Sequence, residues 1–166
     1  MAEMTRPGTA TGEMNAVAAE MIEAAGAEAL FRGQTHPEGR FPFPAVLCTS
    51  VNEEVVHGIP GDRRLRDGDV ISVDCGVRLG GFCGDSARTF AVGTVNGRVR
   101  ALLDVTRDAL GLAVREVRAG RWWGEIAGQI QALVEGAGFS VVRQFVGHGI
   151  GREMWEEPKV PNYVDR

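Results

Sequence analysis

The chain has 166 residues, of which 44% are apolar and 24% are charged, and its formal net charge is −4. This composition is ordinary for a globular protein, and its acidic balance excludes a broad basic surface for nucleic acid or anionic lipid; no apolar run approaches the roughly 20 residues that a membrane-crossing helix needs. The three cysteines, an odd number at irregular spacing, do not read as a disulfide framework and indicate a reducing, cytoplasmic environment.

The first predicted element is a helix that begins at Thr11 and runs to about Phe31. Threonine is a good helix-capping residue, and Gly33 supplies the expected stop. Apolar residues at helical spacing predict the buried face of this helix, namely Met14, Val17, Met21 and Ala25. The next segments are predicted as a loop and two short apolar stretches, at 34–44, 45–51 and 54–57.

A β-hairpin is predicted next. Residues 70–77 alternate between apolar and polar side chains, as a half-buried strand does, and residues 82–92 return after a turn at 79–81. We expect Asp74 and Asp85 to face each other directly across this hairpin, because we place the centre of its turn between Leu79 and Gly80.

Two helices and a strand are predicted for the remainder. A helix over 98–117 is expected to bury a stripe of residues made of Val99, Leu103, Thr106, Leu110, Val114 and Val117. A second helix, over 124–136, is expected to bury Ile126, Ile130, Leu133 and Val134. Residues 139–146 are predicted as a strand that leads into His148.

The chain also resembles itself. Residues 6–14 (RPGTATGEM) and 118–126 (RAGRWWGEI) share Arg, Gly, Gly and Glu at the same offsets, each time at a predicted helix start. Each predicted helix is followed by a strand that ends in His-Gly-Ile, at His57 and at His148. Repeats of this kind indicate two similar α+β halves, although so short a match can also arise by coincidence.

The two aspartates are the strongest chemical signal. Directly opposed residues on antiparallel strands have Cβ atoms about 5 Å apart, and two carboxylates at that distance repel each other unless a cation or a proton lies between them. A hairpin built from Val, Ile and Cys solvates charge poorly, which favours a bound metal or a buried proton between the aspartates. Taken together with His57 and His148, the carboxylates suit divalent Mn, Fe, Co or Zn. The alternatives are a shifted hairpin register, or Asp85 acting as the cap of a turn near Gly84.

The three histidines carry less weight. Glycines surround His148, and His57 has a similar setting, so both are candidate ligands or substrate contacts. A lone histidine at a strand end is more often a structural hydrogen-bonding group than a ligand, and His36, in an exposed-looking loop, is expected to have no role in the site.

Four ordered motifs resemble those of type I methionine aminopeptidases, which share the pita-bread fold with prolidase and creatinase. The motifs lie at 49–60 (TSVNEEVVHGIP), 67–74 (DGDVISVD), 81–86 (GFCGDS) and 147–152 (GHGIGR). The resemblance implies an α+β pita-bread fold with two pseudo-symmetric halves, the second of them incomplete. It also implies that residues 1–166 form one catalytic domain that lacks the C-terminal strands.

The resemblance further implies a site. Asp74, Asp85 and His148 would bind metal, with Asp85 bridging two divalent ions (Co, Mn, Fe or Zn) in the family. His57 would contact the substrate as a catalytic residue, and the pocket for the methionine side chain would include Cys48 and Phe43. The implied reaction is removal of the N-terminal methionine from nascent proteins by attack of metal-activated water on the first peptide bond.

The chain departs from the family in two respects. Trp155 stands where the family has a histidine that contacts the substrate, and the family's two glutamate ligands fall beyond the last residue given. We therefore expect at most one weakly bound metal, weak or no activity from this chain alone, and self-association through an open sheet edge. The alternatives are a non-catalytic pita-bread domain that binds peptides or proteins, and a prolidase-like enzyme, which the motif at 49–60 disfavours.

Overall fold

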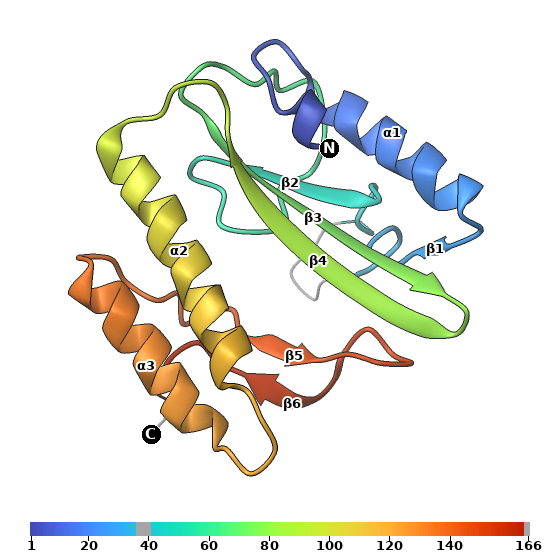
Figure 1. Cartoon of the computed structure of the whole chain (residues 1–166). Helices are drawn as coiled ribbons and strands as arrows, with labels where there is room; N and C mark the ends of the chain where they lie inside the picture. The colour runs from blue at the N-terminus through green and yellow to red at the C-terminus, as the bar shows by residue number, and fades with distance from the viewer. Residues whose placement is uncertain (36–40, 165–166) are drawn as a thin grey trace. The chain divides into compact units, whose positions relative to one another are not determined.

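The computed structural model describes residues 1–35 and 41–164, which group into two compact units. The first unit comprises residues 1–95 with 150–154, and the second comprises residues 96–149 with those from 155 onward. In chain order the elements are a short 3-10 helix η1 (Ala2–Met4), α1 (Thr11–Ala24), β1 (Glu28–Ala29), β2 (Leu47–Val51), β3 (Val70–Leu79), β4 (Phe82–Ala91), α2 (Gly97–Glu116), α3 (Trp123–Gly136), β5 (Gly147–Gly149) and β6 (Glu156–Val160) (Figure 1).

The first unit is an antiparallel sheet with a helix beside it. Strand β3 is central, β4 pairs with one of its edges, and β2 and β1 pair with successive parts of the other edge. Figure 1 shows the long β3–β4 hairpin and α1 next to the short strands β1 and β2. The core of this unit is mainly apolar, and its fully buried large apolar side chains are Met14, Val46, Leu47, Val51, Leu65, Ile71 and Val92.

The β3–β4 hairpin is confirmed, but its predicted register is wrong by two residues. Leu79 pairs with Phe82, so the loop consists of Gly80 and Gly81 alone. Both glycines have positive φ, +60° and +84°, as the two central residues of a type I′ hairpin turn require. Moving the turn centre to this pair sets Asp85 opposite a glycine and not opposite Asp74.

Helix α1 is shorter than predicted, and its predicted buried face is confirmed only at Met14. It ends at Ala24, and Gly26, with φ +65°, stops it in place of Gly33. The buried residues are Thr11, Met14 and Ala18, whereas the predicted inner residues Val17 and Met21 are exposed. The side chain of Thr11 does not cap the helix, because it exchanges hydrogen bonds with the backbone of Gly61.

Helices α2 and α3 form an antiparallel hairpin in the second unit. Asn96 caps α2 by accepting the N–H of Val99 at 2.9 Å. The predicted burial of Ile126 and Ile130 in α3 is confirmed. The predicted face of α2 is wrong: Val105 and Ala109 are its buried residues, and Leu110, for example, is 66% exposed. Helix α2 carries two apolar stripes, and the stripe that packs against α3 is not the predicted one.

The remaining part of this unit is a small two-stranded sheet of β5 and β6. The strand predicted over 139–146 is wrong, since these residues are irregular, and His148 lies within β5 instead of after a strand. Likewise β2 ends at Val51, before His57. The predicted helix starts in the two similar segments are confirmed, because α1 and α3 begin at equivalent positions, Thr11 and Trp123. Across the described residues, no helix is long and apolar enough to span a membrane.

Candidate metal centre

The β3–β4 hairpin places Asp74 and Asp85 on the same face of the sheet. Asp74 pairs with Ala87 and Asp85 pairs with Gly76, so the two aspartates are diagonal neighbours. Diagonal neighbours in a sheet lie roughly 7–8 Å apart. This separation is larger than that of the directly opposed residues which the sequence predicted. Asp74 is half-buried and Asp85 is exposed. The pair therefore stands at the boundary between the sheet and solvent.

The carboxyl group of Asp74 has an altered acidity. Burial, which is the largest cause, together with the charge of Asp85 and a hydrogen bond with Asp85, raises the pKa of Asp74 to about 7. The backbone N–H of Cys75 opposes these effects. The charged form of the pair is thus unfavourable without a proton or a cation beside it.

Small side chains surround the aspartates. On the hairpin, Ala87 lies opposite Asp74 and Gly76 lies opposite Asp85. On the other side of β3, Cys48 of β2 lies opposite Asp74. Burial, followed by the charges of Asp74 and Asp85, raises the pKa of the Cys48 thiol to about 12. Cys48 therefore stays a neutral thiol and acts as a small apolar side chain in this place.

An apolar cluster adjoins Cys48. It consists of Cys48 and three residues that the sequence reasoning missed, Leu30, Phe31 and Met154, with Phe43 and Cys83 packed against it. The predicted partners Cys48 and Phe43 are therefore brought together. The three missed residues come from distant parts of the chain, and no local pattern joins them.

His57 lies in the loop after β2. Its φ is +60°, in the left-handed region that non-glycine residues rarely adopt. The next residue, Gly58, pairs with β2, because its carbonyl accepts the N–H of Thr49 at 2.8 Å. His57 is thereby held along the β2 edge of the sheet that carries Asp74.

His148 and Trp155 belong to the second unit. The Nδ1 atom of His148 lies 2.8 Å from the carbonyl oxygen of Gly149, and Trp155, which directly precedes β6, is 58% exposed. Their predicted roles beside Asp74 and Asp85 remain predictions. His36 lies outside the described residues.

The residues at the aspartate pair fit a divalent ion only in part. Two carboxylates on one face, one of them with a raised pKa, provide the oxygen donors that such ions prefer. Among residues 1–35 and 41–164, however, no group of three or more His, Cys, Asp or Glu side chains is close enough to hold a metal. The aspartates thus fit part of a metal site, and a further ligand has to come from elsewhere.

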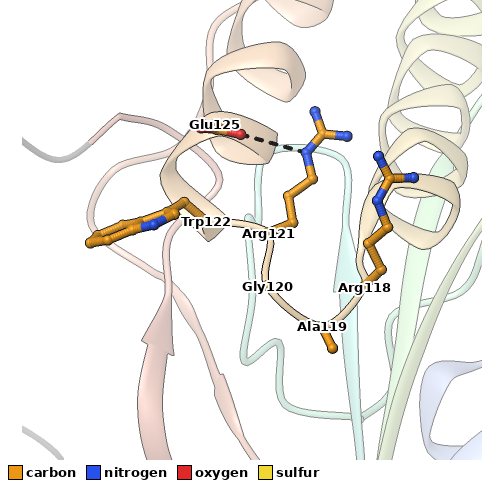
Figure 2. Close-up of a pocket in the computed structure, with 6 residues that line it drawn as sticks. All are labelled: Arg118, Ala119, Gly120, Arg121, Trp122 and Glu125. Atoms are coloured by element: carbon orange, nitrogen blue, oxygen red, sulfur yellow. Dashed lines mark ion pairs between the residues drawn. The ribbon is translucent and has the colours of Figure 1, made fainter.

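Two hollows are lined by other residues. One, of about 480 Å³, belongs to the second unit and is lined by residues at the start of α3, where Figure 2 shows Arg118 and Arg121 pointing the same way and Trp122 pointing elsewhere. Arg121 pairs with Glu116 and with Glu125, so its charge is already balanced. The other, of about 510 Å³, is polar and is lined by Asn52, Asp62, Arg63, Arg64, Arg66 and Asp69. Neither hollow is lined by a predicted site residue.

Comparisons with known proteins agree with one another. The family model of metallopeptidase family M24 matches residues 1–166. A methionine aminopeptidase of Clostridium perfringens is 44% identical over 161 residues, which are 97% of this chain and 62% of that protein. A crystal structure of a methionine aminopeptidase from Thermotoga maritima matches with a TM-score of 0.91 and 35% identity, over 98% of this chain and 64% of that one.

More distant similarity extends to another activity. Prolidase from Pyrococcus furiosus matches with a TM-score of 0.80 over 99% of this chain and 46% of its own, but at 22% identity this likeness concerns the fold alone. The chain spans about 62% of the length of the Clostridium relative.

Proposed function

Because the chain belongs to metallopeptidase family M24 and has the pita-bread fold of its structural neighbours, we propose that it removes the N-terminal methionine from peptides and nascent proteins. The observation that carries this proposal is the diagonal pair of Asp74 and Asp85 on one face of the β3–β4 hairpin. The relatives named methionine aminopeptidases support the substrate class.

In this proposal Asp74, Asp85 and His148 hold a divalent ion, which supplies Lewis-acid activation of water when bound. Carboxylate and imidazole donors suit Mn, Fe, Co or Zn. Asp74 and Asp85 would supply carboxylate oxygens to the ion at the sheet face, and His57 would contact the substrate from the β2 edge. All three cysteines are free, which supports action in the cytoplasm.

The specificity for methionine rests on the apolar cluster beside Asp74. Cys48 and Phe43 belong to this cluster, and an apolar, sulfur-containing wall suits the flexible thioether side chain of methionine. The cluster and the aspartates meet at Cys48, which pairs with Asp74. A substrate with its side chain against the cluster would therefore have its first peptide bond near the carboxylates.

We expect the chain alone to be weakly active and to bind at most one metal ion loosely. Two carboxylates and one imidazole form a sparse ligand set. At position 155 an indole, whose N–H only donates a hydrogen bond, stands in place of an imidazole, which can also take up a proton. Loss of one hydrogen bond to a tetrahedral intermediate typically costs about 10²–10³-fold in rate. The same features favour the second candidate, a non-catalytic domain that binds peptide N-termini.

Calorimetric titration with Mn²⁺ tests the metal site. Asp74→Asn should weaken binding by at least about 10²-fold, because even loss of a residue that only supports a metal ligand costs about 10–100-fold. The matched control is Asp62→Asn, which alters an exposed carboxylate outside the pair. Equal affinity in wild type and Asp74→Asn would refute the site.

Hydrolysis of the peptide Met-Ala-Ser separates the two candidate functions. Slow release of methionine that depends on Mn²⁺ and disappears in Asp74→Asn supports the aminopeptidase. Binding of the peptide without any release, at saturating Mn²⁺, supports the non-catalytic domain instead.

A further inference from the structure

The loop that carries His57 is fixed where it begins. Asn52 has φ +56° and exchanges two hydrogen bonds with Val70: its N–H donates to the Val70 carbonyl at 2.9 Å, and its Oδ1 accepts the Val70 N–H at 2.9 Å. Its Nδ2 donates to Asp69 at 2.8 Å. The loop therefore leaves β2 at a defined point.

The same loop is fixed where it ends. The Gly58 carbonyl accepts the N–H of Thr49 at 2.8 Å, and the Gly58 N–H donates to the Oγ of Ser50 at 3.1 Å. A Cβ atom at position 58 would lie 2.5 Å from the carbonyl oxygen of Thr49, so only glycine allows this close approach. The peptide between His57 and Gly58 is thus held by one side-chain hydroxyl.

Ser50 lies on the face of the sheet that carries the aspartates. Cys48 pairs with Asp74 and Ser50 pairs with Ser72, and residues two apart on a strand point to the same face. The Ser50 side chain is buried, with 4% of its residue surface exposed. Its hydroxyl therefore draws the N–H of Gly58 toward the acidic face.

We propose that Ser50 is a positioning residue, whose buried hydroxyl sets the direction of the His57 imidazole relative to the Asp74–Asp85 pair. A left-handed non-glycine residue keeps its conformation only where its surroundings hold it. The surroundings that hold His57 include the hydrogen bond that the Gly58 N–H donates to the Ser50 hydroxyl. The inference rests on the proposed aminopeptidase function, in which His57 contacts the substrate.

The chain offers a matched pair of variants for the test. Ser50→Ala leaves the buried N–H of Gly58 without its acceptor, so the 57–58 peptide should rotate toward water. Thr49→Val removes the neighbouring hydroxyl, which is also buried but has no hydrogen-bond partner among the described residues. Thr49 contacts Gly58 through its backbone N–H, which valine retains.

The measurement is paramagnetic broadening of the His57 ring signal by Mn²⁺, recorded by NMR on the full chain. The chain has three histidines, and His57→Gln assigns the signal. In wild type and Thr49→Val, Mn²⁺ should broaden this signal equally. In Ser50→Ala the broadening should fall severalfold, whereas the Mn²⁺ affinity from calorimetry stays within about twofold because both aspartates remain.

The outcomes are distinct. Unchanged broadening in Ser50→Ala overturns the positioning role, even if Mn²⁺ binds as expected. No Mn²⁺ binding by wild type, or binding unaffected by Asp74→Asn, overturns the proposed function and the inference with it. If Ser50→Ala does not fold, Ser50→Cys keeps the volume and offers only a weak acceptor, and it should show the same loss in smaller measure. Full broadening in Ser50→Cys would then contradict the proposal.

Discussion

The two edges of the sheet in the first unit are finished in different ways. On the β2 edge, the Asn15 side chain accepts the N–H groups of Val46 and Leu47 at 2.9 and 3.2 Å, and Gly58 covers Thr49. On the β4 edge, the only covered position among the described residues of this unit is the start of the strand, where the Cys83 N–H donates to the Gly151 carbonyl at 2.7 Å.

The backbone bonds of β3 show which groups of β4 face outward. Gly76 and Val70 use their carbonyls on the side away from β4, toward Leu30 and Asn52. Their partners on β4 must therefore point away from β3 as well, because backbone groups alternate along a strand. By this alternation, residues 85, 87 and 89 present their N–H and C=O groups at the open edge.

The covered β2 edge and the open β4 edge therefore contribute to the site in different ways. The covered edge depends on particular side chains and on one glycine, so it can hold His57 in one position. The open edge presents backbone groups that accept any extended segment, and it carries Asp85 next to solvent. Asp74, on the central strand, lies between a fixed edge and an adaptable one.

Proline substitutions at neighbouring positions of β4 should give the largest effect. Ser86→Pro removes an N–H that points toward β3 and should lower the free energy of unfolding by about 3 kcal/mol. Ala87→Pro removes an outward N–H and should cost less than about 1 kcal/mol. Urea unfolding followed by circular dichroism measures both, and equal losses would show that the assignment of outward groups is wrong.

A glycine comparison on the covered edge should give the next largest effect. Gly58→Ala forces a Cβ within 2.5 Å of the Thr49 backbone, and we expect a loss of about 2 kcal/mol. Gly61→Ala is the control, because nothing lies within 4 Å of a Cβ there. Thermal melting of the two variants tests whether the edge needs this close approach, and a Gly58→Ala melt equal to that of Gly61→Ala would contradict it.

Features that depend on local chemistry could be predicted from the sequence. The alternation in 70–77 and the turn signal after Leu79 gave the hairpin and put both aspartates on one face. The register failed because two adjacent glycines, not the Leu79–Gly80 junction, form the turn. The Gly80-Gly81 pair is itself a hairpin-turn signal in the sequence. This pair sets the register, whereas the symmetric spacing of the two aspartates does not.

Features that depend on packing could not be predicted in the same way. Helix α2 has two apolar stripes, and only the partner helix α3 decides which is buried. The cluster of Leu30, Phe31, Cys48 and Met154 joins segments that no periodicity connects. The predicted role of His148 joins it to residues more than 60 positions earlier in the sequence, which a local pattern does not contain.

The next smaller effect concerns self-association, which we expect at the open β4 edge and not at the β2 edge. We expect pairing of two copies through β4, where each net backbone hydrogen bond contributes about 0.5–1.5 kcal/mol. Ala87→Pro removes one such donor from each copy, so the dissociation constant should rise by roughly tenfold. Sedimentation velocity over a concentration series measures this change. A wild-type chain that stays monomeric throughout would remove the open edge as a binding surface.

The smallest effect concerns the pH dependence of stability in the metal-free chain. Burial and the charge of Asp85 raise the pKa of Asp74 from its ordinary 3.8 to about 7 in the folded state. Between these values the folded chain binds more protons than the unfolded one, so the free energy of unfolding falls as pH rises through this window. Below pH 3.8 the contribution is fully present, and above pH 7 it is lost.

The comparison of wild type with Asp74→Asn isolates this contribution from that of other titrating groups. The difference in free energy of unfolding between the two chains should change by about 1 kcal/mol from pH 4 to pH 8, less than the full pKa shift implies because Asp85 is open to solvent. Saturating Mn²⁺ at pH 8 should restore stability to wild type alone, since a cation then takes the place of the proton. A pH-independent difference would mean that Asp74 is well solvated, and that the sheet face between the two edges has no need of a cation.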